Sequence, residues 1–359
     1  MNDLLLVRHA EPYPTESLLG YILRLCEENG YESLRDIYAL ASMNPKDVRK
    51  SVAELRKLSA VTNWPAENLD TIAYSSPVGL PRWSRLLGHP VLPQDLNLTH
   101  PQFCPLCVRE RGFLEAHWEL SLMEACPVHQ CSLLRFCPVC NRRIRWLRPG
   151  LLVCDCGGDL SNPDLLPIPD AEASLLDIVR RRALSGPGDL NAISGSPEYE
   201  LTQMSLSSML LTIRTIGKYR MIADGAKELN SRAGIVSAAS RVFDSWPGNF
   251  LILVEDLNRL KLVRAGCGAG KQFGGVYRCM FQTKAPGGPN HADFLGSFSG
   301  LRRGQLGAWL GKWPAEAFVR TDRPIPLFSS RSTLGESRPA ATTWRLEEAA
   351  CAGSVLRFR

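Results

Sequence analysis

Residues 104–158 are the most informative part of the sequence for the fold and read CPLCVRERGFLEAHWELSLMEACPVHQCSLLRFCPVCNRRIRWLRPGLLVCDCGG. They contain two clusters of cysteine and histidine. The first cluster joins Cys104-Pro-Leu-Cys107 to Cys126-Pro-Val-His129, and the second joins Cys137-Pro-Val-Cys140 to Cys154-Asp-Cys156. Because each pair is so closely spaced, a tight turn can aim both of its side chains at one point.

Zinc explains this spacing, because it binds four thiolate or imidazole ligands in a tetrahedron. Two paired turns fill all four positions, which is typical of structural rather than catalytic zinc. The glycines at 157 and 158 allow the backbone conformations that the last turn needs. We therefore predict two structural Zn²⁺ ions, with the ligands Cys104, Cys107, Cys126, His129, Cys137, Cys140, Cys154 and Cys156.

The ligand set of the first cluster has alternatives. Cys131 can replace His129, and His117 lies inside the intervening loop. We favour His129 because it completes a two-residue turn with Cys126, which leaves Cys131 as a small buried residue. An iron–sulfur cluster is disfavoured by the histidine, and reduced core cysteines are a further alternative. Since the segment has few long apolar runs, we expect zinc to supply most of its stability.

The composition is that of a globular protein of two or three domains, with 359 residues, 45% hydrophobic and 22% charged. A net charge of +6 permits contact with nucleic acid without requiring it. We expect neither a membrane span nor a signal peptide, because long apolar runs and a basic leader are missing from the sequence. A cytoplasmic protein keeps its thiols reduced, so 12 cysteines indicate metal binding.

The segment before the cysteines predicts short helices. Thr15 can cap a first helix that Asn29-Gly30 ends. Ser33 and Asp36 form a capping-box variant that begins the next one. A break at residues 62–65 separates two further helices, which resemble a helix-turn-helix. A small helical bundle that does not touch DNA explains the same pattern equally well.

Helices also follow the cysteines, at about 171–183, 202–219, 232–246 and 248–263, with a loop at 185–198. We therefore predict a mainly α fold. Its predicted parts are an N-terminal helix-turn-helix-like helical domain (1–98), a double zinc-knuckle module of zinc-ribbon type (99–165), a C-terminal helical domain (166–320) and an irregular tail (321–359).

Arginines crowd the second cluster without an acid among them, which can form a surface for nucleic acid or for an acidic protein partner. A solvated loop is the plainer interpretation. The candidate contact residues are Arg135, Arg142, Arg143, Arg145, Trp146 and Arg148.

Residues 266–271 (GCGAGK) look like a phosphate-binding loop, but Ala265 stands where its first glycine belongs and Gln272 replaces the Ser or Thr. We interpret them as a flexible connection. The usual catalytic motifs are missing as well, so we predict no catalytic residues and no enzyme activity.

Several stretches together resemble the TniQ family, which includes the related TnsD proteins. They are Pro12 to Leu18 with Tyr21 to Leu25, Phe103 to Gly112, His117-Trp118, and Cys126 to His129 with the second cluster. Residues 238–247 resemble the later helical region of the family. The resemblance covers residues 10–165 well and 166–285 more loosely.

This resemblance implies a bacterial target-selection factor for transposition, whose eight cluster residues bind zinc. Such proteins are adaptors without catalysis, and they connect a CRISPR RNA-guided effector or a DNA site to an AAA+ ATPase that recruits the transposase. Some members form dimers. The alternatives are a stand-alone sequence-specific zinc-containing DNA-binding protein and a zinc enzyme, which would need an open coordination position.

Overall fold

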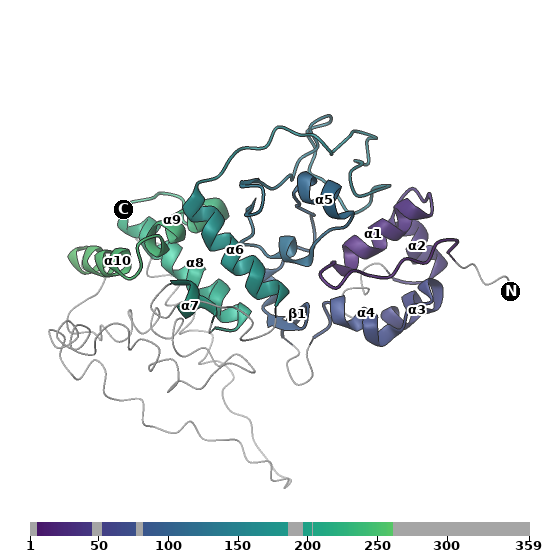
Figure 1. The fold of residues 1–359 in the computed structure, drawn as a ribbon, viewed down its shortest axis with the longest axis horizontal. Coiled ribbons are helices and arrows are strands. Elements are labelled where there is room, and N and C mark those ends of the chain that lie inside the picture. Colours follow the sequence, from purple (N-terminus) through teal and green to yellow (C-terminus); the bar gives the residue numbers. More distant parts are fainter. Residues whose placement is uncertain (1–5, 45–51, 77–81, 186–196, 203, 261–359) are drawn as a thin grey trace, which may run out of the picture. The chain divides into compact units, whose positions relative to one another are not determined.

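Four short helices pack together at the N-terminal end of the molecule (Figure 1). They are α1 (Leu18–Glu28), α2 (Leu34–Leu40), α3 (Val52–Thr62) and α4 (Ala66–Ile72). The computed structural model describes residues 6–44, 52–76, 82–185, 197–202 and 204–260. The remaining residues, which include the predicted phosphate-like loop, the range 261–320 and the tail 321–359, lie outside this description.

Local signals explain most of the ends of these helices. The side chain of Ser33 and that of Asp36 form the predicted capping box of α2, and α1 ends at Asn29 and Gly30 as expected. The predicted cap of α1 is wrong. Ser17, not Thr15, accepts a hydrogen bond from the Gly20 amide, because the helix begins only at Leu18.

The predicted break between α3 and α4 is present. Asn63 has a left-handed backbone (φ +56°), and α4 begins directly after Pro65. Leu55, Leu58 and Leu69 are buried between the helices. The turn therefore has the geometry of two helices packed through an apolar face, which both a DNA-binding unit and a plain helical bundle would show.

The middle of the chain consists of small elements joined by loops. A hairpin of β1 (Ser84–Leu86) and β2 (His89–Val91) leads into the short 3₁₀ turn η1 (Pro93–Asp95). Helix α5 (Pro105–Arg111), the 3₁₀ turn η2 (Ala116–Glu119) and the two-residue strands β3 (Ala125–Cys126) and β4 (Cys131–Ser132) follow. Strands β3 and β4 are antiparallel, with Cys126 opposite Cys131.

Five helices form the last part of the described chain (Figure 1). They are α6 (Asp170–Leu184), α7 (Pro197–Thr202), α8 (Leu206–Ala223), α9 (Arg232–Phe243) and α10 (Gly248–Arg259). Helices α8 and α9 approach closely at Gly217, where any Cβ atom would overlap the carbonyl oxygen of Ile235. The mainly α prediction is confirmed, with few and short strands among the described residues.

The loop at residues 113–123, which we call the bridging loop, contacts both helical groups. The amide of Ala116 donates to the Thr15 carbonyl (2.9 Å), and the amide of Ser17 donates to the Leu114 carbonyl (3.0 Å). On the other side, η2 packs against α6. Trp118 is only 1% exposed. The loop therefore stands at the junction of the helical groups.

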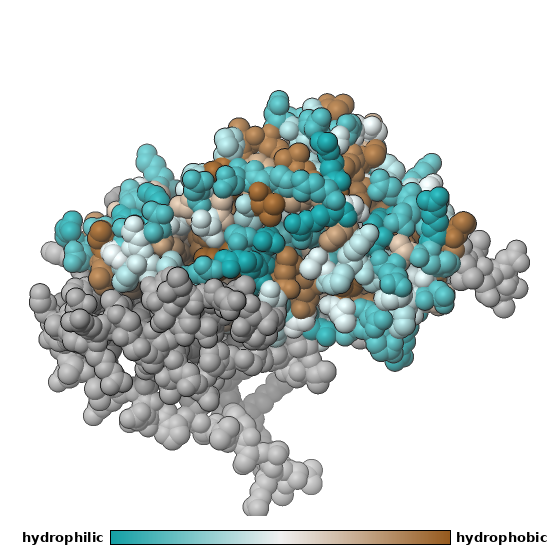
Figure 2. All heavy atoms as spheres, in the orientation of Figure 1, coloured by the Kyte–Doolittle hydropathy of each residue, from teal (hydrophilic) through white to brown (hydrophobic). Residues whose placement is uncertain are grey.

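One buried cluster of apolar side chains includes residues from Leu6 to Leu257, so all three predicted regions contribute to the same core. The domain boundaries at 98 and 165 remain predictions. On the face drawn in Figure 2, hydrophobic residues form small areas among hydrophilic ones. None of the described helices is long and apolar enough to span a bilayer.

Candidate metal centres

The first cluster is assembled from α5 and from the β3–β4 hairpin. Cys104 occupies the N-cap position of α5 and Cys107 lies in the first turn, so the two side chains project from one face of the helix. Cys126 ends β3, and His129 lies in the turn that follows. The four ligand atoms all lie within 4.8 Å of one another.

The distances within this group suit a single ion. The sulfurs of Cys107 and Cys126 are 3.6 Å apart, and Nδ1 of His129 lies 3.2 Å from the Cys107 sulfur. Ligands of a tetrahedral zinc with Zn–S bonds of about 2.3 Å are separated by about 3.8 Å. The amide of His129 also points at the Cys126 sulfur (3.4 Å), which stabilises a thiolate.

The orientation of His129 is set by its second nitrogen. Nε2 lies 2.9 Å from a carboxylate oxygen of Glu110 on α5, which leaves Nδ1 facing the sulfurs. A carboxylate hydrogen-bonded to the far side of an imidazole is the usual support of a metal-binding histidine. The His129 side chain is 17% exposed and Glu110 is 58% exposed, so this support lies at the surface.

The second cluster contains Cys137, Cys140, Cys154 and Cys156, whose ligand atoms also lie within 4.8 Å of one another. Cys137 and Cys156 are 3.8 Å apart, and Cys140 and Cys154 are 4.0 Å apart. The amide of Val139 points at the Cys137 sulfur (3.4 Å). The first group lies at the junction of α5 and the hairpin, whereas the second is formed by turns alone.

The glycines after Cys156 have separate roles. Gly157 has a left-handed backbone (φ +80°), which a glycine adopts without strain. Gly158 passes so close to the first turn that a Cβ atom would lie 2.9 Å from the Val139 side chain and 3.2 Å from the Cys137 sulfur. The sequence-based expectation that this turn needs glycine therefore has a specific structural cause.

Each of the two groups can hold one metal ion, since it offers four converging sulfur or imidazole ligands. Within the described part of the chain, these two groups are where three or more potential metal ligands cluster. Their residues are the eight that the sequence predicts.

Residues 7–133 match the TniQ family model. Over this segment, about a third of the chain, the sequence is similar to the TniQ family. The TniQ segment includes the four N-terminal helices, the bridging loop and the complete first cluster, and it ends before the second cluster begins. A comparison with curated proteins found no match. The match suggests a role associated with transposition.

The bridging loop of the TniQ segment buries His117, which therefore lies away from the four-residue groups. Its ring is 1% exposed, and Nδ1 lies 3.8 Å from Glu115 Oε2. Burial lowers the pKa of His117 well below its usual value, and Arg180 and Arg111 lower it further. Burial raises the pKa of Glu115 although Arg111 opposes the shift. His117 is thus a neutral interior side chain.

Beyond the TniQ segment, two of the predicted contact residues are interior. Arg148 is 1% exposed and donates hydrogen bonds to the carbonyls of Arg145 (2.8 Å) and Gly150 (3.0 Å). Trp146 donates from Nε1 to the Leu98 carbonyl (3.0 Å) and is also buried. Both side chains hold loops together, so neither forms part of the surface.

Three of the four other predicted arginines have acidic partners from outside their own stretch. Arg135 pairs with Glu124, and Arg142 and Arg145 share Asp155. Arg143 is exposed and lies over the ring of Phe136, with 5.7 Å from its guanidinium carbon to the ring centre. The sequence reasoning missed this neutralisation because it considered only the acids inside the arginine-rich stretch.

Apolar side chains also contribute to the cysteine-rich segment. Phe103, Leu120, Met123, Ile144 and Leu160 are all fully buried. Zinc is therefore not the only source of stability that this segment has, in contrast to the expectation that it supplies most of it. Side chains of the bridging loop and of the second cluster, such as Leu120 and Ile144, both belong to the main buried core, so apolar packing stabilises each of them alongside any metal.

Proposed function

We propose that this TniQ-family protein is a non-catalytic adaptor in the selection of transposition targets. In this role it connects a target-recognition complex, either an RNA-guided CRISPR effector or a DNA site, to an AAA+ ATPase that recruits the transposase. The observation that carries the proposal is the TniQ match over residues 7–133. Reduced thiols suit the bacterial cytoplasm, where we place the protein.

We also propose that both cysteine-rich groups bind structural zinc. Their ligand sets, three cysteines with one histidine and four cysteines, are those that zinc prefers in structural sites. Four protein ligands leave no position for water or substrate. This supports a role in which the metal stabilises a scaffold, and it counts against a zinc enzyme.

The position of the first group supports an adaptor role. Its ligands Cys107 and Cys126 lie at the two ends of the segment that contains the bridging loop. A metal ion at this group therefore closes a loop that touches both the N-terminal helices and α6. Closing the loop reduces its conformational freedom, and the helical groups then present their surfaces in a fixed arrangement.

The sequence of α4 counts against the alternative of a stand-alone DNA-binding protein. In a helix-turn-helix, the second helix enters the major groove and its flanks contact phosphates. Here that helix reads AENLDTI, with two acids and no basic residue. Exposed Glu67 would face a phosphate backbone unfavourably. We therefore assign the proposed contact with nucleic acid or an acidic partner to Arg142, Arg143 and Arg145.

A co-purification experiment tests the adaptor proposal. The tagged, metal-loaded protein is mixed with a cognate AAA+ ATPase, in the presence of ATP, a non-hydrolysable analogue or ADP. We expect association that depends on the bound nucleotide. Lack of association in every nucleotide state would reject the adaptor role. Elemental analysis of the same sample tests zinc, with two ions per chain as the expected content.

A DNA-binding titration distinguishes the two functions. A stand-alone reader binds its site far more tightly than unrelated DNA at physiological salt, by a factor of about 1,000 or more. For an adaptor that docks on another complex we expect weak binding without sequence preference. Specific binding by the isolated chain would favour the alternative.

A further inference from the structure

We propose that Cys131 is an alternative ligand of the first metal group, which takes the place of His129 when the histidine leaves the metal. The inference rests on the proposed zinc binding at this group. It assigns the group five potential ligands, of which four bind at a time. His129 is the resident ligand and Cys131 the reserve.

The hairpin register places Cys131 beside a ligand. Cys126 and Cys131 are directly opposite in the antiparallel pair of β3 and β4. Opposite residues of such a pair project from the same face, with their Cβ atoms about 5 Å apart. The Cys131 side chain therefore leaves the hairpin on the side where Cys126 faces the metal group.

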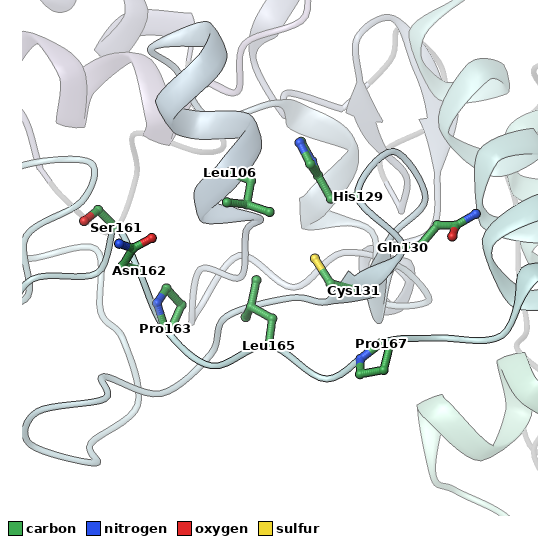
Figure 3. A pocket seen from close by; sticks show the side chains of 9 residues that line it. All are labelled: Leu106, His129, Gln130, Cys131, Ser161, Asn162, Pro163, Leu165 and Pro167. Carbon is green, nitrogen blue, oxygen red and sulfur yellow. The ribbon is translucent and has the colours of Figure 1, made fainter.

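The position of the Cys131 sulfur agrees with this register. It lies 3.9 Å from the Cys104 sulfur. This separation is close to the distance of about 3.8 Å between two sulfurs on one tetrahedral zinc. Figure 3 shows the Cys131 sulfur pointing from the hairpin towards α5 and His129.

A cavity gives these side chains room to move. Its volume is about 300 Å³, and His129 and Cys131 both line it, together with Leu106 and Leu165 (Figure 3). Cys131 is 7% exposed, whereas the His129 side chain is 17% exposed and contacts the exposed carboxylate of Glu110. A turn of the imidazole towards solvent can therefore be matched by rotation of the thiol towards the metal.

The exchange is chemically balanced. The Zn–N bond to His129 breaks and leaves a neutral imidazole. The Cys131 thiol loses its proton to solvent, and its thiolate forms the new Zn–S bond. The ligand set changes from three sulfurs and one nitrogen to four sulfurs, without any change in oxidation state. Because the fourth position is filled again, the group remains closed to water.

Cobalt substitution of the full-length chain tests the exchange, because Co²⁺ absorption reports the number of bound sulfurs. The variants are His129→Asn, Cys131→Ala and the double variant. For His129→Asn we expect unchanged metal content, stronger sulfur-to-cobalt absorption and, by X-ray absorption, one more sulfur with one nitrogen fewer. We expect Cys131→Ala to retain the wild-type spectrum and the double variant to lose the ion of the first group.

Two results would overturn the proposal. In one, His129→Asn loses the ion as fully as the double variant, or keeps it with an oxygen ligand and no added sulfur. In the other, Cys131→Ala changes the wild-type spectrum, which would make Cys131 the resident ligand. A wild-type chain that binds fewer than two ions would count against the proposed zinc sites instead. Far-ultraviolet circular dichroism of each variant verifies that the helices are retained.

Discussion

The Glu27 carboxylate of α1 accepts a hydrogen bond from the Leu151 amide in the second cluster, over 3.1 Å and across 124 residues of sequence. The neighbouring Gly150 is so close to Glu27 that a Cβ atom would lie 2.6 Å from the carboxylate oxygen. The first helix of the TniQ segment is therefore in direct contact with turns beyond that segment. The second cluster and the N-terminal helices form one connected structure.

Glu27→Ala should loosen this contact. The Leu151 amide loses its partner, and we expect a loss of about 1 kcal/mol in the free energy of unfolding. Hydrogen exchange should increase at the amides of residues 150–153 more than elsewhere. Exposed Glu32 offers a control, since Glu32→Ala removes a carboxylate of the same kind. Equal exchange in both variants would show that the contact contributes nothing.

Arg24→Met should be strongly destabilising. Arg24 donates to both carboxylate oxygens of Glu16 (2.8 and 2.7 Å), and the Glu16 side chain is fully buried. Without its partner, the buried carboxylate costs about 3–5 kcal/mol. The double variant Glu16→Gln with Arg24→Met should recover part of this loss. If it is no more stable than Arg24→Met, the uncompensated charge is not the cause.

The loss caused by Arg24→Met should depend on pH. Burial already raises the pKa of Glu16, while Arg24 lowers it, so the variant raises that pKa further. A carboxyl whose folded pKa is above its unfolded value contributes stability at low pH, which is lost as pH rises through the folded pKa. Chemical denaturation of metal-loaded variant and wild type should show a smaller difference at pH 6 than at pH 8. A difference that is independent of pH would contradict this prediction.

Removal of the metal should affect the two clusters unequally. With a strong chelator, we expect protease cleavage to begin within residues 137–158, because that group is built from turns, while α8 and α9 remain protected. Cys137→Ser should lower the metal content from two ions to one. Cys26→Ala, which changes a buried cysteine of α1, should keep both ions. If the first cleavage falls inside α8 or α9, the predicted order of cleavage is wrong.

Gly217→Ala should separate α8 from α9. Alanine favours a helix over glycine, but here its Cβ atom overlaps the Ile235 backbone, which costs about 1–3 kcal/mol. Gly248 at the start of α10 is a matched control, since its Cβ would enter open space. We expect Gly248→Ala to leave the melting temperature unchanged or slightly higher. A Gly217→Ala variant with the melting temperature of the wild type would refute the close approach of α8 and α9.

Arg143→Ala should weaken nucleic-acid binding if the proposed surface is used. Loss of one phosphate contact lowers the slope of log affinity against log salt by about 0.7–0.9. Arg56 on α3 is also exposed, so Arg56→Ala tests the helix-turn-helix interpretation under the same conditions. A reduced slope for Arg56→Ala alone would move the contact from the second cluster to the N-terminal helices.

Features that depend on short spacing can be read from the amino-acid sequence. Two residues between cysteines identify the turns, and Ser33 with Asp36 identifies a helix start, because both interactions form within a few residues. Local geometry is largely independent of the rest of the chain, so a single sequence is sufficient to read it.

The partners of the side chains, in contrast, follow from the folded chain. Folding places Cys131 beside Cys104 and pairs Arg135 with Glu124 and Arg145 with Asp155. It also buries Arg148, which donates hydrogen bonds to backbone carbonyl oxygens. Each of these contacts joins segments whose meeting depends on how the loops fold over the core. Burial and charge pairing are properties of the assembled molecule, and the order of residues does not state them.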